Sequence, residues 1–546
     1  MVAKLTSDRA RWLLLAIAAI VLVVHSLAYN FVTDDAYISF VYSRNLAEHG
    51  QLAFNVGHPV EGYTNFLWTV VLGLLMLVGI PPELSSRVLG TVCALATLYV
   101  VFRVMERALG RKTPWAVVPS LLLAASSGFA CWTSGGLETQ LFTLLCAIAI
   151  DAVVAAEIES AESTADGAGR ARGLRRAGIA LALAAMTRPE GLLVAAVVGA
   201  VRLACNVLAR RRVIARTELV AAAWFLGIWA PWFAWRWWYY GYPFPNTYYV
   251  KAHGPWANPA MAHEMWKLGG YYLWVWLKQT HLVYVLPIAL VGLGAVKPRT
   301  PRFVLALVCA VLAAVYLPYA ASVGGDFMGL HRFIMPMFVV AAVSVTLGLE
   351  WVAARLPRPR EAGIALAVIV VGVFAITQVV LTRKSLRWGN FAADEGVIDT
   401  PAFLIVYTED RAAIGRAMEP CFKPDDFSIV GGAGAQPYYG RMRGIDVFGL
   451  VSDRVAHEEP RIRARAGHTK FASDKLLAEY DPTFVFSCYT IHPTPASPPL
   501  PCNVGFWLSK GYEQLTMHIP GMKQSGEYYT FLAKKSRNFE CPGLVR

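Results

Sequence analysis

The feature that most constrains this chain is a series of apolar runs, most of them long enough to cross a bilayer. A helix needs about 20 predominantly apolar residues to span the hydrocarbon core. Such runs recur at 12–29, 85–105, 114–131, 137–156, 177–187 with 189–207, 217–235, 281–296, 302–321, 333–353 and 361–382. Of the 546 residues, 56% are hydrophobic and 16% are charged. The sequence therefore predicts a polytopic all-α membrane domain over residues 1–382, with about 10–11 transmembrane helices.

The basic residues give this membrane domain an orientation. The formal net charge is +13, and the Lys and Arg residues gather in short clusters between the apolar runs, at 111–112, 170–176, 210–216, 297–302 and 355–360. Clusters in short loops are typical of the cytoplasmic side, so the excess charge does not indicate nucleic-acid binding. Lys4, Arg9 and Arg11 precede the first run, and no small-residue cleavage site follows it. We expect a retained signal anchor with its amino end inside.

Alternation from these clusters places the first loop, 30–64, and the segments around Gly135, Arg188, Asn246 and Asp326 on the extracytoplasmic face. Within the first loop we expect a short interfacial helix that ends at Gly50. The short run 65–80 breaks the alternation, so we predict that it is half-inserted or strongly tilted. The charged, small-residue stretch 157–176 is predicted to be a flexible cytoplasmic linker.

Two interruptions of the apolar pattern stand out. Met186-Thr-Arg-Pro-Glu-Gly191 combines a proline with charges that are costly in lipid, which predicts a helix break that faces protein or a water-filled cavity. The stretch 235–251 is crowded with aromatic residues and broken by Pro and Gly. It is too irregular for a span and is typical of an interfacial aromatic belt.

The last third of the chain, 383–546, has a different composition. Its apolar runs are only four to six residues long, such as 427–430 and 483–486, and they alternate with helical stretches such as 454–466 and 473–480. This pattern predicts an extracytoplasmic soluble α/β domain. Its four cysteines, Cys421, Cys488, Cys502 and Cys541, allow two disulfides in three connectivities, whereas the five earlier cysteines fit apolar packing.

Ionisable residues in the outward loops are the candidates for chemistry, because an unpaired charge in hydrocarbon costs several kcal/mol. Asp34 and Asp35 are the catalytic candidates, although one of the pair is expected to cap the interfacial helix. Each of the others also has a structural explanation as a helix break, a turn residue or a cation that reaches for the interface. The predicted substrate-binding residues are Glu61, Glu138, Arg188, Glu190, Asn246, Lys251, Asp326, His331, Arg332, His468 and Lys470.

The glycine-rich segment Gly431-Gly-Ala-Gly434 does not predict a nucleotide site, because it lacks the spacing of a dinucleotide loop and has no following P-loop lysine. The basic run that contains Arg461, Arg463, Arg465, His468 and Lys470 is usually a solvated helix face. If this run docks onto the membrane domain, its cations can instead meet an anionic lipid head group.

An ordered set of motifs resembles a known family. The motifs are Asp34-Asp35-Ala, Arg44-Asn45-Leu46, Phe54-Asn55, Val60-Glu61-Gly62, Ser134-Gly-Gly-Leu-Glu138, Thr187-Arg188-Pro189-Glu190, Tyr239-Tyr240-Gly241, Pro245-Asn246, Lys251, Gly324-Gly-Asp-Phe-Met328, Ile445-Asp446-Val-Phe-Gly449, Ala456-His457 and Gly467-His468-Thr-Lys470. Their order from about residue 34 to 470 is similar to that of the membrane-embedded GT-C glycosyltransferases, in particular the mycobacterial terminal β-arabinofuranosyltransferases of the cell envelope. The chain departs from the pattern at Gly136 and at Leu330-His331.

The resemblance implies an enzyme of the inner (cytoplasmic) membrane that takes a sugar, arabinofuranose in those relatives, from a polyprenyl-phosphate donor. The acceptor would be an envelope glycan or lipid on the outer face. It carries the family's first-loop acidic motif onto Asp34 and Asp35, and its glycine-rich turn onto Asp326. No cofactor is certain: some GT-C enzymes use a divalent metal held by such carboxylates and others do not. The relatives' products imply net retention, which needs a step beyond a single base-assisted displacement.

From the residues we expect Lys251, Arg188 or Arg332 to neutralise the leaving phosphate, while one aspartate of the pair takes the acceptor proton. The main alternative is a lipid or sugar transporter or flippase, since broken helices and intramembrane charges also occur there. A transporter would place its charges near the midplane, whereas these candidates gather at one face. A third possibility, an envelope scaffold that binds through its soluble domain, leaves the acidic pair unexplained.

Overall fold

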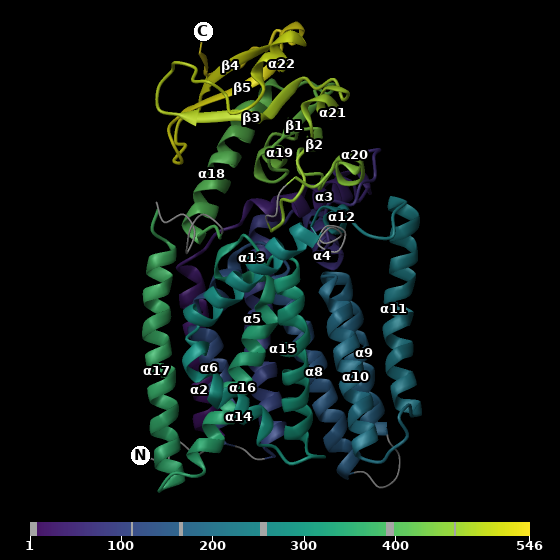
Figure 1. Ribbon diagram of the computed structural model, residues 1–546, viewed down its shortest axis with the longest axis vertical. Helices are drawn as coiled ribbons and strands as arrows, with labels where there is room; N and C mark the ends of the chain where they lie inside the picture. Colours follow the sequence, from purple (N-terminus) through teal and green to yellow (C-terminus); the bar gives the residue numbers. More distant parts are fainter. Residues whose placement is uncertain are drawn as a thin grey trace.

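The computed structural model of the chain describes residues 8–110, 113–162, 168–251, 259–388, 398–462 and 466–545 (Figure 1). A bundle of long helices forms the membrane part, and a small domain with a β-sheet sits on one end of it. The N-terminal end of the first described helix lies at the opposite end of the bundle. The predicted class, a polytopic all-α membrane protein with a C-terminal α/β domain, is confirmed.

Eight helices in the described part are long and apolar enough to cross a membrane. They are α2 (Asp8–Leu27), α5 (Pro82–Leu109), α8 (Thr139–Glu162), α10 (Glu190–Leu208), α11 (Arg216–Tyr240), α15 (Pro301–Ser322), α16 (Met335–Ala353) with the 3₁₀ turn η2 (Gly329–Ile334), and α17 (Pro359–Ser385). Two sharply bent pairs also pass the same test together. Counting each pair as one span gives ten, which agrees with the predicted number.

The two bent pairs mark breaks in the apolar pattern. In the first, η1 (Pro114–Val117) and α6 (Val118–Ala125) meet α7 (Ser127–Ser134) at 63°. In the second, α13 (Pro259–Gln279) and α14 (Leu282–Gly294) meet at 88°. The predicted break around Arg188 also exists: α9 (Ala168–Thr187) ends there and α10 follows Pro189.

The wall beside the acidic pair is built as expected. Helix α3 (Asp34–His49) follows α2 and ends at Gly50, which adopts the left-handed conformation with φ 68°. Helix α4 (Phe66–Leu77) has 12 residues, so it extends about 18 Å and is too short for a hydrocarbon core of about 30 Å. This length agrees with the expectation that 65–80 does not cross fully, and its insertion stays a prediction.

Three expectations about the helices need correction. Much of the predicted linker 157–176 is helical, because α8 and α9 extend into it from both sides; residues 163–167 lie outside the described part. Helix α11 continues into the aromatic stretch as far as Tyr240 and ends at Gly241, since aromatic residues do not break a helix but a left-handed glycine does. Helix α13 was not predicted, because polar residues and Gly269-Gly270 interrupt its apolar residues.

The C-terminal domain contains a six-stranded mixed sheet in the order β2-β1-β3-β5-β4-β6. Its strands are β1 (Ser428–Val430), β2 (Gly444–Asp446), β3 (Phe484–His492), β4 (Tyr512–His518), β5 (Tyr528–Lys534) and β6 (Leu544–Val545). Strand β1 pairs in parallel with β2 and β3, and the other pairs are antiparallel. The predicted strands at 427–430 and 483–486 are thus confirmed.

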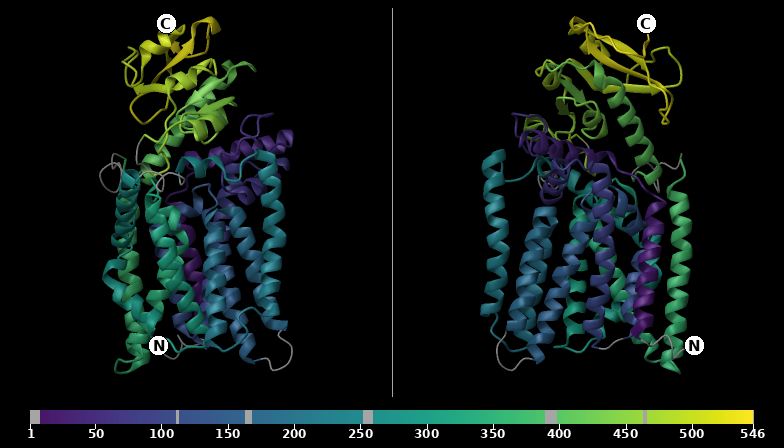
Figure 2. Two further views of the ribbon diagram at one scale, coloured as in Figure 1. Left: turned by 45° about the vertical axis from the view of Figure 1, so that its right-hand side comes forward. Right: turned by 180° about the vertical axis from the view of Figure 1, so that it is seen from behind.

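Helix α18 (Pro401–Met418) leads into this domain and stands between the bundle and the sheet (Figures 1 and 2). The remaining helices are short: α19 (Ala435–Tyr439), α20 (Asp453–Glu458), α21 (Asp474–Ala478) and α22 (Val504–Ser509). The predicted helix 454–466 ends early, at Glu458, and Pro460 follows at once. Arg461 and Lys470 instead pair as a β-bridge, and residues 463–465 lie outside the described part.

The C-terminal domain rests on the first loop of the membrane domain. Arg44 donates to the backbone oxygen of Tyr438 at 2.6 Å. The Asn55 side chain bonds both backbone groups of Gly444, at 2.8 Å and 2.9 Å. These contacts join residues almost 400 positions apart in the sequence. The loop 30–64 therefore forms the surface of the membrane domain that contacts the sheet domain.

Two disulfides close the C-terminal domain, Cys421–Cys541 and Cys488–Cys502. The five earlier cysteines are free and buried, as expected. The first disulfide closes a loop of 120 residues. Since a cross-link lowers the entropy of the unfolded chain more for longer loops, replacing Cys421 and Cys541 by alanine is expected to destabilise the domain by about 4–5 kcal/mol.

Thermal unfolding of the purified full chain, followed by a signal from the C-terminal domain, checks this prediction. The matched control replaces Cys488 and Cys502, which close a much shorter loop and are expected to cost about 3 kcal/mol. Equal losses in the two double variants would contradict the loop-length argument.

Candidate active site

The acidic pair lies at the first turn of α3, where the chain leaves α2 and turns along the surface of the bundle. The backbone N–H of Thr33 donates to the oxygen of Gly135 at 3.1 Å, which ties the start of α3 to the loop after α7. Thr33 occupies the capping position without a side-chain bond. The expectation that an aspartate of the pair caps this helix was therefore wrong: both residues lie inside its first turn.

Asp34 points away from the bundle and into the C-terminal domain. The backbone N–H of Ala435, the first residue of α19, donates to its carboxylate at 2.8 Å. Burial raises the pKa of Asp34 to about 6, although the Ala435 hydrogen bond acts in the opposite direction. Asp34 thus holds the loop in front of α19 and has no direct access to the membrane-domain cavity described below.

The glycine-rich segment 431–434 packs closely against Asp34. A Cβ atom on Gly434 would lie 2.2 Å from the Asp34 backbone oxygen and 2.4 Å from its carboxyl carbon. Only a residue without a side chain allows this approach. A phosphate loop is rich in glycine because its backbone must approach the phosphate oxygens closely. In this segment the backbone approaches the Asp34 carboxylate instead.

Arg411 of α18 completes the surroundings of Asp34. Its guanidinium lies over the rings of Tyr407 and Tyr489, at 4.8 Å and 4.2 Å from the ring centroids. It also donates to the Tyr489 hydroxyl at 2.6 Å. The side chain is buried, and its positive charge favours ionised Asp34. Arg411 was missed from the sequence because it sits in an ordinary amphipathic helix.

The contact between Asp34 and Ala435 makes a testable prediction. Asp34→Ala removes the acceptor and leaves a buried N–H group unsatisfied, which costs about 1.5–3 kcal/mol, or roughly 10- to 150-fold in local opening. Hydrogen exchange of residues 431–439 should accelerate accordingly. Asp34→Asn keeps an acceptor oxygen and is the matched control, with exchange close to that of the wild type. Unchanged exchange in Asp34→Ala would show that the loop is held by other contacts.

A charged cavity of about 210 Å³ opens on the other side of the acidic pair, at the end of the bundle beneath the C-terminal domain. Seven of the predicted residues line it, and they come from five separate segments of the chain. These residues are Asp35, Glu138, Arg188, Glu190, Lys251, Asp326 and Arg332. The extracytoplasmic clustering predicted from the sequence thus corresponds to a single cavity.

The Arg188 break supplies a buried ion-pair network to this cavity. Arg188 donates to Glu138 at 2.8 Å and to Glu190 at 3.1 Å. Asn65 donates to the second oxygen of Glu138 at 2.8 Å, and the Tyr319 hydroxyl donates to Glu190 at 3.3 Å. Burial acts to raise the pKa of Glu138, but Arg188 and Arg332 outweigh it and leave that pKa below its ordinary value. Both glutamates are therefore already engaged by protein donors.

The turn around Asp326 has the predicted form. Gly324 and Gly325 have φ of 84° and 71°, and a Cβ on Gly325 would lie 2.5 Å from the ring of Tyr272. Asp326 accepts from Arg332 at 3.4 Å. Between them, Leu330 and His331 take left-handed conformations, with φ of 57° and 62°. The Leu330-His331 departure from the family pattern therefore lies in the turn that brings Arg332 back to Asp326.

Two charged side chains in the cavity remain unoccupied. Within the described part of the chain, neither Asp35 nor Lys251 forms a side-chain hydrogen bond or ion pair, although both line the cavity. Burial raises the pKa of Asp35, and the positive charges of Lys251 and Arg332 oppose that shift. The cavity thus holds one carboxylate and one ammonium group that are free to act on a ligand.

The other predicted residues do not line the cavity. Glu61 is buried and paired with Arg236, whose Nε donates to it at 2.8 Å. Asn246 donates to the backbone oxygen of Leu450 at 3.3 Å. His331 is buried and hydrogen-bonded to Gln279 at 3.0 Å. These three residues hold elements around the cavity in place, and their predicted contact with substrate stays a prediction.

His468 and Lys470 also lie outside the cavity lining. The ring of His468 packs against Phe327 and Phe448, at 4.8 Å and 4.6 Å between centroids. Lys470 donates to the backbone oxygen of Ala456 at 2.6 Å. The neighbouring Gly467 does line the cavity. The segment therefore contacts the membrane domain, as considered from the sequence, but through this glycine and not through its basic side chains.

Several residues of the site were not predicted. Asn65 and Tyr319 bind the two glutamates. Phe244 and Tyr248, which also line the cavity, belong to the predicted aromatic stretch 235–251. Arg236 could have been found, since it is an arginine inside an aromatic membrane-boundary stretch and therefore needs a buried partner. Asn65 and Tyr319 carry no signal of their own in the sequence.

The carboxylates that the described residues contribute to the cavity do not form a metal-binding group. Among the described residues, no three His, Cys, Asp or Glu side chains gather closely enough to hold an ion. Three of the four cavity carboxylates are already engaged by Arg188 or Arg332. A divalent cation prefers several free oxygen ligands, and Asp35 alone does not provide them.

Comparison with known proteins supports the fold. No protein-family model matches the sequence, and no curated protein matches it significantly. Among solved structures, ArnT from Cupriavidus metallidurans in the apo state is 14% identical, with a TM-score of 0.59 over 97% of this chain and 99% of that one. ArnT bound to undecaprenyl phosphate is similar, at 14% identity and a TM-score of 0.58 over 96% and 98% of the two chains.

An oligosaccharyltransferase from Archaeoglobus fulgidus, tethered to an acceptor peptide, is 10% identical with a TM-score of 0.55. The alignment covers 99% of this chain and 76% of that one. At such low identity these matches establish architecture alone. The chain is a polytopic membrane protein with the GT-C-like fold of these transferases, membrane helices and C-terminal domain included.

Proposed function

We propose that this protein is an integral membrane glycosyltransferase that moves a sugar from a polyprenyl-phosphate donor to an envelope glycan or lipid acceptor. The observation that carries the proposal is the pair of free charges in the cavity, Asp35 and Lys251. A transfer of this kind needs a base for the acceptor hydroxyl and a cation for the leaving phosphate. The other charged residues that the structure describes in the cavity lining are engaged in ion pairs.

The position of the cavity fits a lipid-linked substrate. It lies at the end of the bundle, where a phosphate at the membrane surface would be found, and not midway along the helices. Phe244 and Tyr248 line it, and such aromatic rings are suited to the interface and to sugar faces. A transporter would be expected to hold its charges near the midplane.

In the proposed reaction, the acceptor hydroxyl oxygen attacks the anomeric carbon of the donor sugar. Its proton moves to the carboxylate of Asp35, the bond from that carbon to the phosphate oxygen breaks, and polyprenyl phosphate leaves beside Lys251. Arg332 adds positive charge while it stays paired with Asp326. Arg188 is held by two glutamates, so we assign it the support of the cavity wall.

The orientation and the sugar are also part of the proposal. The basic clusters and the cysteine-bridged domain favour an inner-membrane protein with its cavity and sheet domain on the extracytoplasmic side. The ordered motifs favour arabinofuranose as the sugar. A single displacement inverts the anomeric carbon, so the configuration of the product distinguishes one displacement from two.

Purified protein in proteoliposomes, supplied with polyprenyl-phosphate arabinose and an envelope arabinan acceptor, tests the proposal. A glycosylated product that depends on both substrates is expected, and its anomeric configuration follows from NMR. Glycan analysis of a deletion strain should show loss of the same linkage. Movement of labelled donor across the vesicle membrane without any product would favour the transporter instead.

A further inference from the structure

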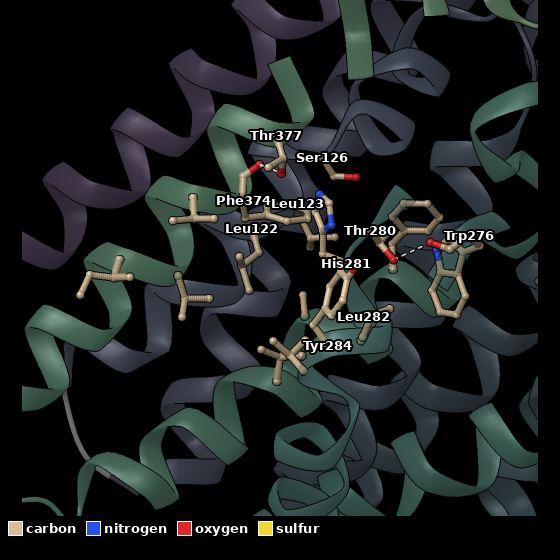
Figure 3. Close-up of a pocket in the computed structure, with 18 residues that line it drawn as sticks. Leu122, Leu123, Ser126, Trp276, Thr280, His281, Leu282, Tyr284, Phe374 and Thr377 are labelled. Atoms are coloured by element: carbon tan, nitrogen blue, oxygen red, sulfur yellow. Dashed lines mark hydrogen bonds between the residues drawn. The ribbon is translucent and has the colours of Figure 1, made fainter. Parts of the chain in front are cut away.

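The charged cavity is distinct from an apolar cavity that lies among α6, α13, α14, α16 and α17 (Figure 3). None of the described residues that line the apolar cavity also lines the charged one. Its described lining contains no Lys, Arg, Asp or Glu, so it offers no charged group to a phosphate. Contacts that bear on the free charges Asp35 and Lys251 are found instead where the C-terminal domain meets the membrane domain.

Lys251 is the last residue of α12 (Asn246–Lys251), a helix of six residues that lies beneath α20 of the C-terminal domain (Figure 1). So short a helix forms few internal hydrogen bonds, and its last carbonyl groups have no partner within the helix. The direction in which its end points therefore depends on contacts from other segments. Val250, which precedes Lys251, is fully buried.

The C-terminal domain supplies donors to the carbonyl groups at this end of α12. The guanidinium of Arg461 donates to the backbone oxygen of Tyr249 at 2.6 Å and to that of Val250 at 3.3 Å. The Thr469 hydroxyl also donates to the Val250 oxygen, and Arg461 donates to that hydroxyl at 3.0 Å. Two side chains of the C-terminal domain thus converge on the peptide group that joins Val250 to Lys251.

These hydrogen bonds restrict Lys251 because a peptide group is planar. The Val250 oxygen and the Lys251 Cα atom belong to one rigid unit, so donors that fix the oxygen also fix the plane in which that Cα lies. Beyond the Cα atom a lysine side chain is flexible. Its stem passes next to Gly467, where a Cβ atom would lie 3.7 Å from the Lys251 Cε atom. The segment 461–470 therefore contacts both the backbone in front of Lys251 and its side chain.

The start of α12 is held separately from its end. The backbone N–H of Asn246 donates to the Glu61 oxygen at 3.0 Å, and its side chain donates to the Leu450 oxygen at 3.3 Å. The C-terminal domain is also docked through Arg44 and Asn55. Loss of a donor at the end of α12 should therefore loosen that end without detaching the domain.

We propose that Arg461 and Thr469 are positioning residues, which fix the end of α12 so that the Lys251 ammonium group faces the leaving phosphate. The proposal rests on the role proposed above for Lys251. Arg461 and Thr469 are not among the residues that line the charged cavity, so they act through Lys251. A displacement of a catalytic group by about 1 Å can cost roughly 10²-fold in rate.

The first test measures kcat for the full chain in proteoliposomes with polyprenyl-phosphate arabinose and an arabinan acceptor. Arg461→Met removes the donors but keeps an unbranched side chain, and should lower kcat about tenfold. In the Lys251→Met background the same substitution should change kcat by less than about twofold, because the residue that it misplaces is already absent. Thr469→Val should also lower kcat, and Thr469→Ser, which keeps the hydroxyl, should restore it. Equal fold losses for Arg461→Met in both backgrounds would overturn the proposal.

The second test does not depend on transferase activity. Trace acetylation of amines in the purified full chain, quantified by peptide mass spectrometry, measures the accessibility of Lys251. Arg461→Met and Thr469→Val should each increase its labelling severalfold, because a loosened end of α12 lets the ammonium group leave the cavity. Arg454→Met is the matched control: Arg454 lies on α20, is partly exposed and pairs with Glu458 and Glu479, so labelling and kcat should stay unchanged.

The two tests separate failure of this proposal from failure of the proposed function. A wild-type protein that transfers no sugar would refute the function, while labelling of Lys251 would still test the hold on α12. Variants are compared only when their thermal unfolding matches that of the wild type, and the pair Thr469→Val and Thr469→Ser serves where Arg461→Met does not fold. Labelling of Lys251 that stays unchanged in the folded variants would overturn the proposal.

Discussion

Asp35→Asn is expected to lower sugar transfer by about 10²- to 10⁴-fold, the usual contribution of a positioned general base. The reason is geometric: Asp35 lines the charged cavity and has no partner among the described residues, so its carboxylate is available to the acceptor hydroxyl. An amide has nearly the same shape but cannot take a proton. Assays with purified variants at saturating donor should show the loss in kcat, with donor binding little changed.

Asp34→Asn is the matched control for this loss, because it changes the adjacent carboxylate in the same way. Among the described residues, the Asp34 side chain accepts a hydrogen bond from Ala435 alone, and an amide oxygen can accept it as well. Its activity should therefore stay within severalfold of the wild type. Equal and severe losses in both variants would contradict the division of roles, and full activity in Asp35→Asn would eliminate Asp35 as the base.

Lys251→Met is expected to lower transfer by about 10²- to 10³-fold, as does removal of one preorganised group that stabilises developing charge. Lys251 is the one cavity cation without an ion-pair partner in the described part of the chain, and the leaving phosphate needs such a group. Lys267→Met is the control, because Lys267 is exposed on α13 and pairs only with Glu264 at 4.0 Å.

The same variant changes the pH profile. Burial raises the pKa of Asp35 and Lys251 opposes the shift, so the net pKa lies above the ordinary value for aspartate. A base must be ionised, hence activity falls as pH falls through this pKa. Removing Lys251 takes away a charge that lowers it, so the acid limb of kcat/KM against pH should move to higher pH. A limb that stays in place would show that Lys251 does not influence the base.

The sequence was sufficient for the membrane part because hydrophobic length is a direct physical requirement of the bilayer. Even the anomalous run 65–80 was recognised, since its failure to fit the charge alternation reflected a helix too short to cross. Helix α13 escaped because its polar and glycine residues conceal an apolar face. The other members of the bent pairs, α6, α7 and α14, are each too short to be a span on their own.

The cavity residues were predictable as a group, but their roles were not. Ionisable residues at membrane boundaries are costly and therefore conspicuous, which is why seven candidates proved to line one cavity. Which charged residues form ion pairs with each other depends on contacts between residues far apart in the sequence, such as Arg188 with Glu138 or Arg236 with Glu61. No local pattern encodes those pairings, so the free residues could not be told from the occupied ones.

The two aspartates illustrate the limit most clearly. Adjacent positions on a helix point about 100° apart, so one residue of the pair had to face elsewhere, but the sequence does not say which. The answer depends on the glycine segment 431–434, some 400 residues away, which closes around Asp34. The glycine-rich composition of this segment suggests a ligand-binding loop. Only the three-dimensional structure shows that the group it binds is the Asp34 carboxylate.

The close packing of that segment around Asp34 links the C-terminal domain to the start of α3. Asp34 and Asp35 share a single peptide unit, so the domain and the base are coupled with almost no slack between them. A displacement of the segment 431–435 would therefore act on the backbone next to Asp35. If Asp35 has the proposed role, the position of the C-terminal domain therefore sets the orientation of the base through the Asp34 contact.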